Sequence, residues 1–334
     1  MAALLEREAL LEAMQASADQ AARGNGHTVL ASGEAGVGKT SLLERFTSGF
    51  EHGRVLWGGC EALATPRPLG PLHDVAAQCG GALAERLASS TDGAGLFAAV
   101  LQELSRAPTP TLLVIEDLHW ADEATLDLVK YLGRRIHQVP ALLLLSHRDD
   151  PASLERLRPL LGDLPTTHTT RLSVPLLSRD AVDRISVGAS RKDAARIHAA
   201  TGGNAFFVAE LLRQGGEGAA VPETVRDAVL ARAASLAAPA LQVLHLVAIV
   251  PTQAEIALVD AVLAPSADAV DACVASGLLV TDGRRLRFRH ELARSAVEAS
   301  VPPLRAAQFH ARLLGELAAR REGTVSFAAL AHHA

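Results

Sequence analysis

An eight-residue stretch, Gly33 to Thr40, constrains the fold of this chain more than any other part of the sequence. Its residues, GEAGVGKT, match the pattern G-x-x-x-x-G-K-[ST], with an apolar run before it and the start of an amphipathic helix at residues 41–46 after it. Glycines let the backbone turn successive N–H groups toward one point, which makes an anion site at a helix N-terminus. A merely flexible glycine-rich loop would not need Lys and Thr at this spacing. The residues predicted to bind a nucleotide here are Gly33, Glu34, Ala35, Gly36, Val37, Gly38, Lys39, Thr40 and Ser41.

Residues 112–117, LLVIED, place two acids directly after an apolar run. Uncompensated buried charge is costly, so these acids need a cation or a proton nearby. The glycine-rich loop at residues 33–40 accounts for the two acids. Lys39 is expected to reach the β- and γ-phosphates of a nucleotide, and the Thr40 hydroxyl is expected to bind Mg²⁺. A carboxylate on a neighbouring strand then holds the ion, and a second one orients the attacking water. We assign Glu116 to the metal and Asp117 to the water, although the reverse order is open; with Lys39 they form the predicted catalytic set.

Three further apolar runs predict strands at residues 55–58 and 141–146 and, more weakly, at residues 167–174. Helical patterns separate them, and alternating strands and helices favour a parallel sheet with helices on both faces. The run at residues 112–115 is apolar at every position, which is typical of a central strand in such a sheet.

Arg148 directly follows the run ALLLLSH, at the carboxyl end of its strand. Ligands bind at this edge of parallel sheets. Arg148 is therefore expected either to contact the γ-phosphate or to pair with Asp149 or Asp150, and both alternatives are open.

Two acids are expected to begin helices. Asp122 precedes the helical pattern EATLDLVKYLGRR, and Asp150 is followed by Pro151 at a first helical position. Trp120, which lies between Asp117 and Asp122, is expected to pack against the sheet rather than to touch a ligand.

Composition, charge and cysteine spacing exclude several classes of protein. The formal net charge of -5 gives no general attraction to nucleic acid. The three cysteines lie far apart without a CxxC pair, which indicates a reducing compartment and neither a disulfide framework nor a zinc site. The N-terminus lacks the features of a signal peptide, and no apolar run is long enough to span a bilayer. We expect a cytoplasmic protein with no membrane partner.

After residue 174 the sequence becomes a series of helical segments rich in Ala, Leu and Arg. They are expected at residues 191–200, 206–213, 223–236, 239–250, 253–263 and 267–277. Residues 278–281 and 285–289 flank Asp282-Gly283, a strong hairpin signal, and helices followed by a hairpin are similar to a winged helix. Arg285, Arg287 and Arg289 would share one face of the hairpin, meeting DNA, solvent, another domain or the nucleotide. We do not expect this chain to bind DNA directly.

His332 and His333 are adjacent on a helix and diverge, so no metal site is expected there.

Five motifs together resemble a known class: GEAGVGKTS, LLVIEDLHWAD, SHRDD, TGGNAFFVAELL and RFRHELARSAVE. The chain resembles the nucleotide-binding portion of the signal-transduction ATPases with numerous domains, the STAND class of P-loop ATPases. Within that class it is most similar to the large MalT-like bacterial transcriptional regulators that end in a LuxR-type helix-turn-helix. The resemblance implies an α/β P-loop NTPase with a parallel sheet and flanking helices, followed by an α-helical lid and a winged-helix domain. The implied boundaries are 1–174 for the ATPase core, 175–220 for the lid, 221–302 for the winged helix and 303–334 for the start of a truncated helical-repeat region.

The resemblance also implies roles for residues outside the loop. In that class the core, lid and winged helix close over ADP, and exchange for ATP opens the protein for assembly. Arg7, in the entry motif LEREALL, would lie near the nucleotide, and His290 would contact the β-phosphate in the closed state. The alternative for His290 is an ordinary surface histidine after a strand. Ala205 stands where members of that class usually carry Pro, whose ring packs near the adenine. The smaller Ala is expected to weaken this contact with the base.

These features lead to one main hypothesis and two alternatives. The main one is a molecular switch that binds ATP or ADP with Mg²⁺, hydrolyses ATP slowly and serves as the nucleotide-sensing module of a transcriptional regulator. Its other partners would be a second copy of the chain, or the C-terminal sensor and DNA-binding domains that the sequence lacks. The alternatives are a mechanical AAA+ loader or remodeller, which needs an arginine from a neighbouring subunit, and a DNA-binding module with structural ATP.

Overall fold

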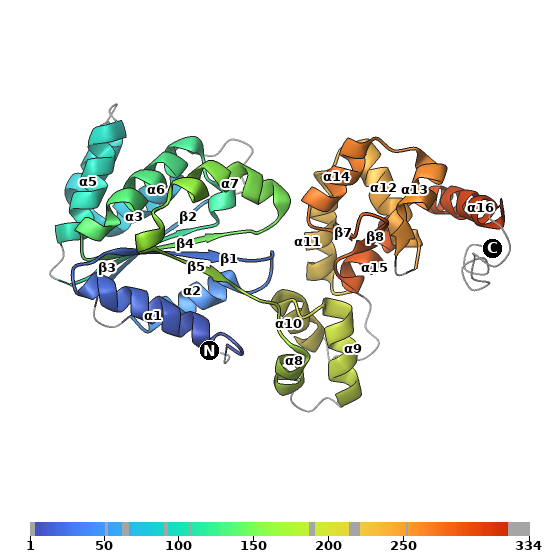
Figure 1. Cartoon of the computed structure of the whole chain (residues 1–334), viewed down its shortest axis with the longest axis horizontal. Helices are drawn as coiled ribbons and strands as arrows, with labels where there is room; N and C mark the ends of the chain where they lie inside the picture. Colours follow the sequence, from blue (N-terminus) through green and yellow to red (C-terminus); the bar gives the residue numbers. More distant parts are fainter. Residues whose placement is uncertain are drawn as a thin grey trace. The chain divides into compact units, whose positions relative to one another are not determined.

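The computed structural model describes residues 4–50, 53–61, 67–89, 93–106, 109–186, 191–213, 221–251 and 253–319. The chain divides into two compact units, Met1–Pro175 and Leu176–Ala334. They run from blue to green and from yellow-green to red in Figure 1. None of the helices in the described ranges is long and apolar enough to cross a membrane.

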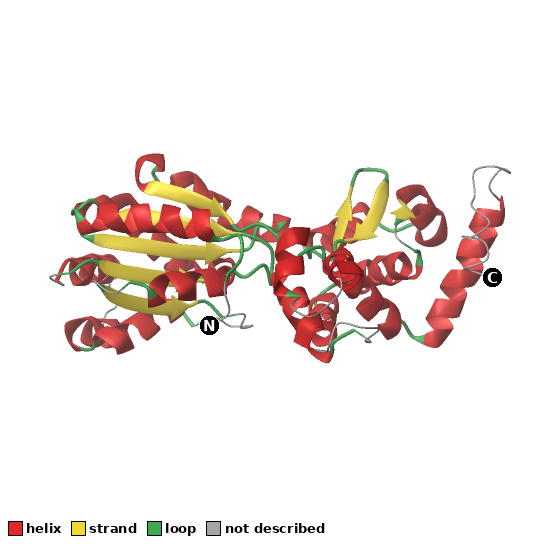
Figure 2. Cartoon of the chain, turned by 90° about the horizontal axis from the view of Figure 1, so that it is seen from below, coloured by secondary structure: helices red, strands yellow, loops and turns green. Residues whose placement is uncertain are grey.

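The first unit is built on a parallel sheet in the order β2-β3-β4-β1-β5. Its strands are β1 His27–Ser32, β2 Arg54–Gly59, β3 Thr111–Glu116, β4 Ala141–His147 and β5 Thr169–Ser173. The arrows of this sheet point the same way in Figure 2. The sequence prediction of a parallel sheet is therefore confirmed, and each predicted strand is present with ends shifted by a few residues at most.

Helices cover both faces of this sheet because its central strands β3 and β4 are apolar on both sides. Leu112 and Val114 of β3 face one core together with residues of α1 (Glu8–Ala22) and α2 (Lys39–Ser48). Leu113 and Ile115 face the other core. Its helices are α3 Gly70–Cys79, α4 Gly81–Ser89, α5 Gly93–Arg106, α6 Glu123–Arg135 and α7 Pro151–Asp163. Figure 1 shows the two layers on either side of the strands.

The predicted helix starts in this unit are confirmed by their caps. The Asp122 carboxylate accepts hydrogen bonds from the backbone N–H groups of Ala124 and Thr125 at the start of α6. Asp150 accepts one from the N–H of Ser153, with Pro151 at the first position of α7. Such caps satisfy N–H groups that the helix itself leaves without partners. The described residues of this unit also form three short 3-10 turns: η1 Leu118–Trp120, η2 Ile136–Gln138 and η3 Thr166–His168.

Over its described residues the second unit is helical with one small sheet. Its helices are α8 Arg179–Ile185, α9 Arg191–Thr201, α10 Ala205–Arg213, α11 Glu223–Ala234, α12 Ala238–Ile249, α13 Ile256–Leu263, α14 Ala267–Ala275, α15 Glu291–Ser300 and α16 Pro303–Ala319. The strands are β6 Ala254–Glu255, β7 Leu279–Thr281 and β8 Arg285–Phe288, in the antiparallel order β6-β8-β7. The finer division of this unit at residues 220 and 302 stays a prediction.

The hairpin predicted around Asp282-Gly283 is present as β7 and β8. Within β8, Leu286 and Phe288 are buried while Arg285 and Arg287 are exposed, which confirms the predicted alternation. One expectation is wrong: residues 253–263 are not helical throughout, because Ala254 pairs with Leu286 of β8 before α13 begins. His332 and His333 lie outside the described residues.

Candidate active site

The loop between β1 and α2 adopts a conformation that depends on its glycines. Gly36 and Gly38 have φ values of 80° and 99°, in the left-handed region that glycine enters without steric cost. A Cβ atom at Gly33 would lie 3.0 Å from the Val174 carbonyl oxygen. Gly38 is the N-cap residue of α2 and offers no side chain to cap the helix. The first N–H groups of α2 are therefore left for an anion, as the sequence motif predicts.

The remaining loop residues differ in what they expose. Val37 is 1% exposed and belongs to the core that α1 and α2 share, so only its backbone can meet a ligand. Glu34 and Ala35 are half-buried, whereas Thr40 and Ser41 are exposed on the first turn of α2.

Lys39 is a buried cation held by the loop itself. Its side chain Nζ lies 2.8 Å from the Gly33 carbonyl oxygen and 3.0 Å from that of Glu34. Burial lowers the pKa of Lys39, and the nearby Asp117 carboxylate opposes that shift. In the described part of the chain no carboxylate forms an ion pair with it. A buried ammonium without a counter-ion favours binding of an anion beside it.

Arg7 braces the same loop from the N-terminal segment. Its guanidinium donates hydrogen bonds to the carbonyl oxygens of Val37 (3.3 Å), Pro175 (2.7 Å) and Glu6 (3.1 Å). The residue is 2% exposed, and burial lowers its pKa. Arg7 thus ties the loop to Pro175, two residues after the end of β5, and its contact with a nucleotide stays a prediction.

Thr40 and Glu116 meet across the sheet edge. The Thr40 hydroxyl donates a short hydrogen bond to the Glu116 carboxylate at the end of β3. Burial raises the pKa of Glu116, while this hydrogen bond lowers it. Hydroxyl and carboxylate oxygens are the ligands that Mg²⁺ prefers, so the pair fits a magnesium ion. The described residues contain no group of three or more His, Cys, Asp or Glu side chains able to hold a metal. A magnesium ion held by this pair would take its remaining ligands from phosphate oxygens and water.

Asp117 leaves the strand in a strained turn. Its backbone is left-handed, with φ 57° and ψ 45°, a conformation that costs a non-glycine residue about 1–3 kcal/mol. Two hydrogen bonds hold the turn: the Asp117 N–H donates to the Ser146 hydroxyl (3.0 Å), and the Trp120 N–H donates to the Asp117 carbonyl (2.8 Å). Burial raises the pKa of the Asp117 carboxyl, and the cations Lys39 and Arg148 oppose the shift.

Two residues beside Asp117, Ser146 on β4 and His119 in η1, were not predicted from the sequence. Ser146 was visible only as the polar residue at the end of an apolar run. The side chain of His119 is 2% exposed, and its Nδ1 lies 3.7 Å from the Asp117 carboxylate. Burial, followed by the charges of Arg148 and Lys39, lowers the pKa of His119 to about 3. His119 is therefore neutral at physiological pH.

Arg148 and Trp120 contact each other at the same edge. The Arg148 guanidinium lies 5.4 Å from the centre of the Trp120 ring, within range of a cation–π interaction. The expectation that Trp120 packs against the sheet is wrong, because Trp120 is 37% exposed and Leu118 takes the buried position instead. Asp150, one of the suggested partners of Arg148, caps α7. Whether Arg148 contacts a γ-phosphate stays a prediction.

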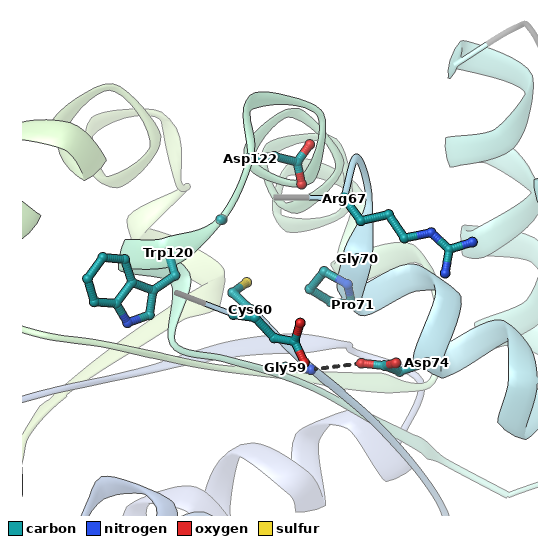
Figure 3. A pocket seen from close by; sticks show the side chains of 10 residues that line it. Gly59, Cys60, Arg67, Gly70, Pro71, Asp74, Trp120 and Asp122 are labelled. Atoms are coloured by element: carbon teal, nitrogen blue, oxygen red, sulfur yellow. Dashed lines mark hydrogen bonds between the residues drawn. The ribbon is translucent and has the colours of Figure 1, made fainter. Parts of the chain in front are cut away.

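A cavity of about 250 Å³ lies beside the turn (Figure 3). Its lining comes from the end of β2, the start of α3 and the segment after β3: Gly59, Cys60, Glu61, Arg67, Gly70, Pro71, Asp74, Trp120, Ala121 and Asp122. Two of its acids have structural partners, since Asp74 accepts from the Gly59 N–H and Asp122 from the Leu69 N–H. Burial raises the pKa of Cys60 to about 12, so it is not a thiolate nucleophile at neutral pH. None of the residues 33–40 lines this cavity.

His290 lies in the second unit at the start of α15. Its ring meets the Phe207 ring edge-on at 5.1 Å, and a Cβ atom on Gly202 would lie 3.0 Å from its Nδ1. The residue is 6% exposed, so the alternative of an ordinary surface histidine is wrong. The TGGN segment and the RFRH segment are thus in contact within this unit. Ala205 is the first residue of α10.

Comparison with known proteins supports the assignment of the first unit. Residues 3–145 match the family described as the AAA ATPase domain. This range includes the glycine-rich loop and both acids after β3. A search of curated proteins gave no match.

Solved structures provide likenesses of fold at low sequence identity. The Walker-type ATPase PABY2304 of Pyrococcus abyssi has a TM-score of 0.58 and 14% identity, over 88% of this chain and 96% of its own. The ORC2 protein of Aeropyrum pernix, solved as ADPNP-ADP complexes, has the same TM-score and identity over 95% and 96%. A STAND protein with a tetratricopeptide repeat sensor from Pyrococcus horikoshii has 15% identity over 91% of this chain and 44% of its own. Its TM-score is 0.42.

The first unit has a P-loop NTPase fold. Residues 3–145 are similar to an ATPase domain of the AAA type, and the geometry of the loop and of the acids agrees with that similarity. Nucleotide binding is supported by the same match.

We expect the stability of the first unit to fall as the pH drops below about 6.5. Burial lowers the pKa values of His27, His119 and His147, so the unfolded chain binds more protons than the folded one below the ordinary histidine pKa. Each imidazole contributes at most about 1.4 kcal/mol per pH unit. Glu116 and Asp117, whose pKa values are raised by burial, act in the opposite direction.

Urea denaturation at pH 7.5, 6.5 and 5.5 measures this effect. The His27→Gln variant, which keeps a hydrogen-bonding group near Thr170, should show a shallower decline. Equal unfolding free energies at pH 7.5 and 5.5 would contradict the expectation.

Proposed function

We propose that this chain is a nucleotide-dependent molecular switch that binds Mg²⁺-ATP, hydrolyses it slowly, and acts as the nucleotide-sensing module of a transcriptional regulator. The observation that carries the proposal is the meeting of Thr40 and Glu116 beside the buried ammonium of Lys39. A nucleoside triphosphate with a divalent ion needs three groups at a helix N-terminus: a hydroxyl, a carboxylate and a cation without an ion-pair partner.

In this proposal each side chain has one task. The N–H groups of the loop and of α2 bind the phosphates, and Lys39 neutralises charge on the β- and γ-phosphates. Thr40 and Glu116 would hold Mg²⁺, which when bound neutralises the charge that develops on the phosphate oxygens. Arg7 keeps the loop in shape through Val37. Ser41 and Arg148 complete the proposed contacts.

Asp117 is the proposed group that orients the attacking water. Its carboxyl is 40% exposed, so a water molecule can reach it. Its raised pKa makes it a stronger base than an ordinary aspartate. The left-handed turn moves Asp117 out of line with β3, and this supports different tasks for the two adjacent acids.

The second unit would transmit the nucleotide state. We propose that α8 to α10 form the lid and that α11 to α15 with the β6-β8-β7 sheet form a winged helix. Support comes from the packing of His290 against Gly202 and Phe207, which joins the two parts inside one unit. His290 would contact the β-phosphate in the ADP state and keep the protein closed. Regulation of transcription is carried over from the resemblance in sequence.

A mechanical AAA+ ATPase is the second candidate. The family match and the likeness in fold to the ORC2 protein favour it as much as they favour the switch. Such a machine turns over quickly and only as an oligomer, because a neighbouring subunit supplies an arginine. The third candidate, a DNA-binding module, is favoured by the exposed Arg285 and Arg287 and would show salt-dependent binding to short duplexes.

Lys39→Ala should abolish nucleotide binding while leaving the fold intact. The variant removes the cation that faces the phosphates, and an affinity loss of about a hundredfold or more is expected from a charge-assisted contact in a buried site. Titration of a fluorescent ATP analogue measures the affinity. Lys130→Ala is the matched control, because Lys130 pairs with Asp163. Unchanged ATP affinity in Lys39→Ala would contradict the proposal that this loop binds the phosphates.

Asp117→Asn should keep Mg²⁺-ATP binding and reduce hydrolysis by about a hundredfold or more, the usual contribution of a general base. Glu116→Gln should instead weaken the dependence of binding on Mg²⁺. Single-turnover hydrolysis and binding with and without Mg²⁺ separate the two effects. If Asp117→Asn loses Mg²⁺-dependent binding and Glu116→Gln does not, the two assignments are exchanged.

The nucleotide carried by freshly purified protein separates a switch from a motor. We expect near-stoichiometric ADP to be released on denaturation, because a closed switch holds its product. His290→Ala should lower that amount, and chromatography of the released nucleotide measures it. An empty site with ready ATP binding and turnover that rises with protein concentration would favour the AAA+ machine.

A further inference from the structure

His119 is buried beside the proposed site without a hydrogen-bond partner. In the described residues neither its Nδ1 nor its Nε2 has one, although the side chain is only 2% exposed. A buried polar group without a partner costs free energy, and such cases in folded proteins call for an explanation. A purely packing role would be filled at lower cost by an apolar side chain.

The surroundings of His119 restrict what it can do. Its ring packs against Trp120 at 5.0 Å between ring centres, which limits its orientation. Lys39, Arg148, His147 and Arg156 all disfavour a second proton on the ring. A neutral imidazole carries one N–H donor and one acceptor nitrogen. The nearest carboxylate oxygen is Oδ1 of Asp117, 3.7 Å from Nδ1.

We propose that His119 is a positioning residue for Asp117: as the neutral Nδ1–H tautomer it donates a hydrogen bond to Asp117 Oδ1 when Mg²⁺-ATP is bound. This inference rests on the proposed role of Asp117 in hydrolysis. The bond fixes one oxygen of the carboxylate and leaves the other for the water. Hydrogen bonds of this kind are often long without substrate and tighten in the complex. No existing hydrogen bond of His119 has to break for the ring to close the distance.

The local backbone favours this arrangement. Asp117 and His119 are two residues apart, and the left-handed Asp117 followed by the 3-10 turn η1 brings their side chains together. The turn is fixed on one side by Ser146 and on the other by Leu118, which is fully buried. A carboxylate held at its backbone but free at its side chain would otherwise sample several rotamers.

Three substitutions of His119 test the proposal, because they differ in where they can donate. The amide nitrogen of Asn lies near the position of Nδ1, that of Gln lies near Nε2, and Leu has no donor. We expect His119→Leu and His119→Gln to lower the hydrolysis rate about tenfold to a hundredfold, the usual effect of losing a hydrogen bond to a charged group. His119→Asn should restore most of the rate. ATP affinity and melting temperature should change little.

A double-substitution cycle with Asp117→Asn separates positioning from structure. If His119 acts through the Asp117 carboxylate, His119→Leu should lower the rate no further in the Asp117→Asn background. An equal loss in both backgrounds, or equal rates in the Asn and Gln variants, would overturn the proposal.

Nitrogen-15 NMR of the histidine side chains in the wild-type protein gives a test that does not need turnover. On addition of Mg²⁺, ADP and aluminium fluoride, Nδ1 of His119 should carry the proton and become protected from exchange. A ring protonated only at Nε2 would overturn the inference even if the variants fail to fold. If the wild type binds but does not hydrolyse ATP, the proposed function fails in part while this measurement still decides the hydrogen bond.

Discussion

The parallel pairing of β3, β4 and β1 is the constraint on which the rest of the site depends. Ser32 of β1 is paired with His147 of β4, and Ile115 of β3 with Leu145 of β4, so the three strands end at one edge. The phosphate-binding loop, the two acids and Arg148 all lie at that edge. The loop with Lys39 follows β1, the two acids end or follow β3, and Arg148 follows β4. Helices cover both faces of these strands, so the strand ends and the segments that follow them are where this part of the sheet can meet a ligand.

The edge concentrates charge that the protein does not neutralise internally. Lys39 donates hydrogen bonds to two backbone carbonyl oxygens, and Arg7 donates to three others. Burial raises the pKa values of Glu116 and Asp117. Each of these groups costs stability when buried. A ligand that carries negative phosphates and a divalent ion offsets the cost on both sides at once. Ligand binding and folding stability are then linked, since whatever binds only the folded state stabilises it.

Much of this arrangement could be predicted from the sequence because its signals are local. Apolar runs predicted the strands, Asp122 and Asp150 marked helix starts, and the glycine spacing predicted the loop. What the sequence did not reveal depends on tertiary packing. The burial of His119 and the exposure of Trp120 follow from the left-handed backbone at Asp117, which no residue pattern announces. Strand β6 is two residues long and is a strand only because β8 lies beside it. The bracing by Arg7 joins Val37 and Pro175, which are distant in the chain.

The left-handed backbone of Asp117 also bears on how this site can evolve. Asparagine and glycine tolerate that conformation, whereas β-branched residues do not. Aspartate and asparagine codons differ by a single base. One nucleotide change therefore removes the carboxylate while the turn, the strand and the phosphate loop keep their shape. A protein of this fold could therefore lose hydrolysis and keep nucleotide binding through one substitution that leaves the backbone unchanged.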